Sequence, residues 1–170
     1  MEFDFLVPID NEIIDYKNHL SSQHIGGVMA LHTDDAFPDL SEVKIALVGV
    51  LENRGDEGVA TVVDLTSVRK SLYGLFMGNW KMGIADLGDI LAGNSTMDTY
   101  FAVKKVVASL IKKGIVPIVI GGSQDLTYAL YRAYDELEQM VNLVAIDNKF
   151  DFGKETDRLS STSYLTKMVI

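Results

Sequence analysis

The chain has 170 residues, of which 48% are hydrophobic and 23% are charged. This length and composition predict a single folded domain with a substantial core and argue against extensive disorder. The formal charge of −9 disfavours a nucleic-acid partner, because phosphate binding relies on clustered Lys and Arg. Cysteine is absent, which excludes disulfide scaffolds, thiolate zinc sites and a cysteine nucleophile, and fits a reducing compartment.

Neither a signal peptide nor a membrane span is visible in the sequence. The N-terminus lacks a basic region followed by a long apolar stretch. The longest apolar runs, such as residues 115–120, are too short to cross a bilayer. We therefore expect a cytoplasmic protein with no membrane partner.

Residues 1–42 are predicted to form an N-terminal helix and an arm. Asp10 is suited to cap a short helix that runs to Leu20. Residues 21–42 are polar and contain glycine and proline, so we expect a long loop there. The nearly continuous apolar run over residues 44–51 then predicts a central strand that is buried on both faces.

Helical periodicity alternates with short apolar runs in the rest of the chain. Helices are expected over residues 62–76, 95–113 and 125–138, and strands over residues 83–87, 115–120 and 141–146. Ser95 supplies an N-cap, and Pro117 is tolerated best if its missing N–H faces an unpaired edge. This order predicts a single three-layer αβα domain over residues 43–170 with a mainly parallel sheet. Ligands of such sheets bind beyond the carboxyl ends of the strands.

Three charged side chains follow the strand that is expected over residues 141–146. Asp147, Lys149 and Asp151 stand at alternate positions, so in extended backbone they point to one side. The two carboxylates suit a divalent cation, whereas Lys149 between them acts as an internal counter-ion and weakens that attraction. From the spacing alone, Lys149 is favoured as a counter-ion of the two carboxylates over a cation site between them.

Two other strand ends carry polar residues. Ser123 follows Gly121 and Gly122 at the start of a helix, where free N–H groups favour either an anion or a capping side chain. The cap is the favoured interpretation. Asp86 is expected to cap N–H groups in a turn that ends at Asp89.

The remaining polar features predict surface positions. Residues 49–58 match neither glycine-rich phosphate-binding pattern, and they are expected to form a shaped surface loop. His19, His24 and His32 all precede the first core strand and lack the His-x3-His spacing of metal ligands. We expect all three histidines to be surface residues.

Taken in order, the strand ends over residues 44–152 resemble the ureohydrolase family of arginase, agmatinase and formimidoylglutamase. The segment Ile45-Ala-Leu-Val-Gly-Val50 is similar to the opening strand of that family, and Asp86-Leu-Gly-Asp89 to its Asp-x-Gly-Asp turn. Residues 117–122 and 144–147 resemble the two strands that lead to its metal site. The resemblance implies an arginase-like α/β fold that is incomplete in this chain, which ends within an apolar segment.

The resemblance also implies where the metal ligands of the family would stand. Its Gly-Gly-Asp-His-Ser and Asp-Ala-His-x-Asp motifs supply ligands to a pair of Mn²⁺ ions. Gln124 and Lys149 occupy the two histidine positions here, whereas Asp147 and Asp151 keep their type. A neutral amide is a weaker transition-metal ligand than imidazole, and an ammonium group cannot ligate at all. A degenerate metal site is therefore expected.

A third family motif, Ser-x-Asp-x-Asp-x-x-Asp-Pro, supplies the carboxylates that bridge both ions, and no Asp-x-Asp occurs in this chain. The first hypothesis is a ureohydrolase-like protein without a binuclear manganese centre, with no catalytic residues and a binding, scaffolding or oligomeric role. The second is a working manganese hydrolase of linear amidines such as formiminoglutamate. The third is a flavodoxin-like module that binds an anion or nucleotide. The resemblance further implies a homo-oligomer.

Overall fold

The computed structural model describes residues 3–56, 63–154 and 158–169, and a single sheet organises them. The strands follow the order β1-β4-β3-β5, and β2 also pairs with β4. β2, β3 and β5 are parallel to their neighbours, whereas β1 runs antiparallel to β4. The strands are β1 (Leu6–Val7), β2 (Ala30–Leu31), β3 (Val43–Leu51), β4 (Gly83–Leu91) and β5 (Val116–Ile120). The expected mainly parallel α/β fold is confirmed.

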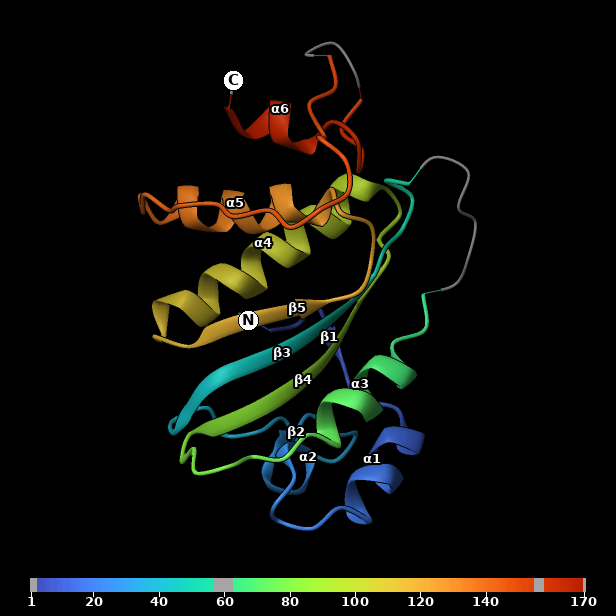
Figure 1. The fold of residues 1–170 in the computed structure, drawn as a ribbon, viewed down its shortest axis with the longest axis vertical. Helices are drawn as coiled ribbons and strands as arrows, with labels where there is room; N and C mark the ends of the chain where they lie inside the picture. The colour runs from blue at the N-terminus through green and yellow to red at the C-terminus, as the bar shows by residue number, and fades with distance from the viewer. Residues whose placement is uncertain (1–2, 57–62, 155–157, 170) are drawn as a thin grey trace.

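Helices cover the two faces of the sheet in separate groups. Figure 1 shows α4 and α5 on one side of the sheet, and α1, α2 and α3 on the other. The helices are α1 (Asn11–Asn18), α2 (Ile25–Val28), α3 (Thr66–Tyr73), α4 (Thr96–Lys112), α5 (Leu126–Glu136) and α6 (Tyr164–Val169). No helix in the described ranges is long and apolar enough to cross a membrane.

Alternate residues of β3 face these two helical layers. Ala46, Val48 and Val50 pack in the larger buried cluster, which also contains residues of α4 and α5. Leu47 points the other way and packs with Tyr73 of α3 in the smaller cluster. All these side chains are at most 4% exposed. The alternation explains why β3 is apolar along its whole length, as expected for a parallel strand between two layers.

Several elements lie where the sequence places them. Asp10 caps α1 by accepting the N–H of Glu12, and Ser95 caps α4. The Ser95 cap is reciprocal, because Asp98 at the third helical position also accepts the backbone N–H of Ser95. Such a capping box satisfies two backbone donors that the helix leaves free, and it fixes the start of α4.

Three expected elements differ in extent from those observed. α3 begins at Thr66, and residue 62 of the helix expected over 62–76 lies outside the described residues. β4 continues four residues beyond the expected end at 87, to Leu91. The segment 21–42, expected to be a loop, contains α2 and the two-residue strand β2. A strand this short offers no alternation for a sequence pattern to detect.

The strand predicted over residues 141–146 is wrong. The segment forms no strand, and Val144 and Ile146 are 83% and 97% exposed. The apolar run reflects strand propensity, but a strand forms only where a neighbouring strand and a packing surface are present. β5 therefore stays at the edge of the sheet, and it contains Pro117.

Candidate functional site

The carboxyl ends of β3, β4 and β5 meet at one edge because these strands run parallel. Beyond β5, Gly121 and Gly122 have φ angles of 84° and 76°, which glycine adopts without strain. A Cβ atom on Gly122 would stand 2.6 Å from the carbonyl oxygen of Glu52. The N–H of Ser123 donates to that oxygen at 2.8 Å. The turn is thus held against the loop after β3.

The Ser123 hydroxyl does not cap α5, so the predicted cap is wrong. Ser123 Oγ is buried and has no hydrogen-bond partner among the described residues. Asp125 has helical backbone angles, and the N–H groups of Leu126 and Thr127 donate to the carbonyl oxygens of Ser123 and Gln124 at 3.1 and 3.0 Å. These backbone bonds already satisfy the donors that a capping hydroxyl would have served.

Asp147, Asp151 and Gln124, which the sequence singles out, lie together with Tyr164 of α6. Gln124 Nε2 donates to the Tyr164 hydroxyl oxygen at 3.4 Å. Asp147 Oδ1 accepts the backbone N–H groups of the next two residues at 2.5 and 3.3 Å. Asp151 is 4% exposed, and its Oδ2 atom has no hydrogen-bond partner in the described part of the chain. Tyr164 had no signal in the sequence, because it lies outside every motif considered.

The pKa values of the two carboxyl groups shift in opposite directions because the groups interact. Hydrogen bonding between them lowers the pKa of Asp147. Burial, followed by the hydrogen bond and charge of Asp147, raises the pKa of Asp151, and the Lys149 ammonium opposes that increase. A pair that interacts this closely releases its protons in two separate steps.

These residues do not fit a pair of manganese ions. The candidate ligands comprise two carboxylates and one amide, and Lys149 brings a positive charge to the same loop. Within residues 3–56, 63–154 and 158–169, no group of three or more His, Cys, Asp or Glu side chains is arranged to hold a metal. Imidazole is a stronger ligand for a transition-metal ion than an amide, and the two positions that the family motifs give to imidazole hold Gln124 and Lys149 here.

The three histidines form hydrogen bonds away from the loop that holds Asp147 and Asp151. His19 and His32 each hydrogen-bond a backbone carbonyl oxygen through Nδ1, at 2.7 and 2.9 Å. His24 Nδ1 lies 3.0 Å from the Ser21 hydroxyl. His19 is exposed, whereas His24 and His32 are half-buried. The expectation of surface positions therefore holds fully only for His19.

An ion-pair cluster lies on the sheet face that α3 covers. Arg69 of α3 contacts Asp86 through Nε and Asp89 through Nη2, each at 2.8 Å. The Tyr73 hydroxyl donates to Asp86 at 2.9 Å, and the Gly88 N–H donates to Asp86 at 3.0 Å. Asp86 thus caps an N–H group as predicted. The turn lies within β4 rather than after it, because Gly88 at φ 85° allows the strand to kink and continue.

Glu52 anchors a second buried cluster, although residues 49–58 were expected to form a surface loop. Glu52 is 1% exposed and accepts hydrogen bonds from Arg54 Nε at 2.9 Å and the Thr99 hydroxyl at 2.8 Å. Arg54 also donates to the carbonyl oxygens of Gly93 and Asn94 at 2.8 and 3.1 Å. The loop after β3 is therefore tied to the start of α4. Residues 57 and 58 lie outside the described ranges.

A family model described as the Arginase family matches residues 61–169, well over half of the chain. The chain belongs to the arginase family. No curated protein matches it. The arginase-family assignment confirms the resemblance drawn from the strand ends, and it fits a mainly parallel sheet with ligand loops at one edge.

Solved structures of similar fold include three ureohydrolases. A formiminoglutamase from Trypanosoma cruzi with Mn²⁺ has a TM-score of 0.66 at 19% identity over 76% of this chain and 48% of its own. The agmatine ureohydrolase of Thermoplasma volcanium gives 0.63 at 19% identity over 92% and 53%. A hypothetical agmatinase from Burkholderia thailandensis gives 0.63 at 17% identity over 77% and 45%. The chain therefore spans about half the length of these structures.

Proposed function

We propose that this arginase-family chain does not use a binuclear manganese centre, and that its role is binding or assembly rather than amidine hydrolysis. The observation that carries the proposal is the set of side chains at the carboxyl edge of the sheet. Gln124 and Lys149 replace two imidazoles, and the remaining carboxyl groups of Asp147 and Asp151 interact directly with each other.

The substitutions oppose metal binding in two ways. An amide oxygen is neutral and a weaker ligand than imidazole for a borderline metal ion, and an ammonium group has no lone pair to donate. The positive charge of Lys149, which opposes the increase in the pKa of Asp151, also reduces the negative potential that attracts a dication.

Metal analysis tests this proposal directly. The protein is purified with Mn²⁺ present, passed through a desalting column and analysed by plasma emission spectrometry. We expect no stoichiometric manganese. The double variant Gln124→His/Lys149→His is the positive control, and it should retain more manganese than the unmodified chain because two imidazoles are restored. Retention of about two equivalents by the unmodified chain would overturn the proposal.

Hydrolysis of a linear amidine by manganese is the second candidate, and the names of the similar structures support it. It requires release of ammonia, formamide or urea when the protein is incubated with formiminoglutamate, agmatine or arginine and Mn²⁺. Product formed at a rate proportional to protein concentration would establish this activity and exclude a purely non-catalytic role. Family membership removes the support for a flavodoxin-like module. A cytoplasmic location and a homo-oligomeric state remain part of the proposal.

A further inference from the structure

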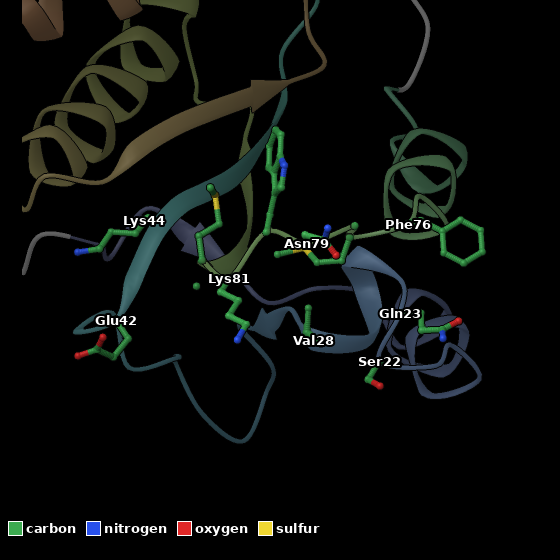
Figure 2. Close-up of a pocket in the computed structure, with 13 residues that line it drawn as sticks. Ser22, Gln23, Val28, Glu42, Lys44, Phe76, Asn79 and Lys81 are labelled. Carbon is green, nitrogen blue, oxygen red and sulfur yellow. The ribbon is translucent and has the colours of Figure 1, made fainter.

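We draw no further inference here: the strongest candidate, the hollow of about 780 Å³ at the amino ends of β3 and β4 that Lys44, Lys81 and Phe76 help to line (Figure 2), is continuous with the apolar sheet face beside β5, and nothing in the part of the chain that the structure describes shows what covers either surface.

Discussion

Within the described part of the chain, Arg69 is the one cation that contacts the carboxylates of Asp86 and Asp89 on the α3 face of the sheet. Its side chain is 4% exposed, and that of Asp86 is fully buried. Burial raises the pKa of Asp86, and the hydrogen bonds from Arg69, Gly88 and Tyr73 oppose that increase. Removal of the guanidinium would leave a buried carboxylate whose desolvation is no longer compensated.

We predict that Arg69→Ala lowers the free energy of unfolding by about 3–5 kcal/mol, because breaking a buried pair leaves an isolated charge. Urea denaturation followed by circular dichroism measures the change. Lys70→Ala is the matched control on the same helix. The Lys70–Glu12 pair is 35% and 63% exposed, so its loss should cost less than about 1 kcal/mol. Equal effects of the two substitutions would contradict the prediction.

Gly122 and Gly114 share a left-handed conformation but differ in their surroundings. Their φ angles are 76° and 70°. A Cβ atom on Gly114 meets nothing within 4 Å, whereas one on Gly122 would stand 2.2 Å from Leu126 Cδ1 and 2.6 Å from the Glu52 carbonyl oxygen. Backbone strain is therefore common to both positions, and steric overlap is confined to Gly122.

Substitution of each glycine by alanine separates the cost of backbone strain from the cost of steric overlap. Gly114→Ala should lower the free energy of unfolding by about 1–2 kcal/mol, the cost of a left-handed residue with a Cβ. Gly122→Ala should add a further cost of roughly 1–3 kcal/mol, because the Glu52 carbonyl belongs to the backbone and cannot move aside easily. Thermal unfolding of both variants measures the difference. Indistinguishable melting temperatures would argue against the packing of this turn.

Among the elements, α4 and α5 are joined at one end by Glu136. Its carboxylate contacts Lys104 and Lys105 of α4 at 2.8 and 2.9 Å. Hydrogen bonds from these two ammonium groups lower the pKa of Glu136 to about 2, from an ordinary value of 4.5. Both ion pairs of Glu136 are largely solvated, so their contribution to stability is small and decreases with added salt.

The pKa shift predicts the direction of a pH effect. A carboxyl group whose pKa is lower in the folded protein stabilises it above the unfolded pKa, and this contribution disappears as the pH falls through the folded pKa. The unmodified chain should therefore lose more stability than Glu136→Gln between pH 4.5 and about 2. Melting temperatures at pH 6, about 3 and about 2 compare the two proteins. A larger loss in the variant would refute the prediction.

At the scale of the whole molecule, the open edge of β5 is a site for aggregation. Val116 is 59% exposed on this strand, and among the described residues β5 pairs only with β3. A lysine on an exposed edge hinders pairing with another chain. Val116→Lys should therefore raise the concentration at which light scattering begins. Met97→Lys, on a 60% exposed helical position, changes the net charge equally and should have a smaller effect.

The sequence predicted the elements whose signals are local. The Ser95 cap and the apolar stripe fixed α4, and the continuous apolar run fixed β3. It failed for residues 141–146, because strand formation depends on a neighbouring strand that no local pattern reveals. At the site, Asp147 and Asp151 were identified from their alternate spacing and Gln124 through a family motif. Tyr164 and the Glu52 cluster were missed, because they depend on contacts between segments that are distant in sequence.

The outer edge of β4 is closed by the short strands β2 and β1, which pair with its first and last parts. Among the described residues, the sheet therefore has one edge that short strands cover and one edge, at β5, that has no further strand. Two copies that joined through β5 would cap each other, so growth would stop at a pair. Removal of residues 1–9, which include β1, would unblock part of the other end and permit linear polymerisation. An N-terminal truncation is thus expected to turn a self-limiting association into filament formation.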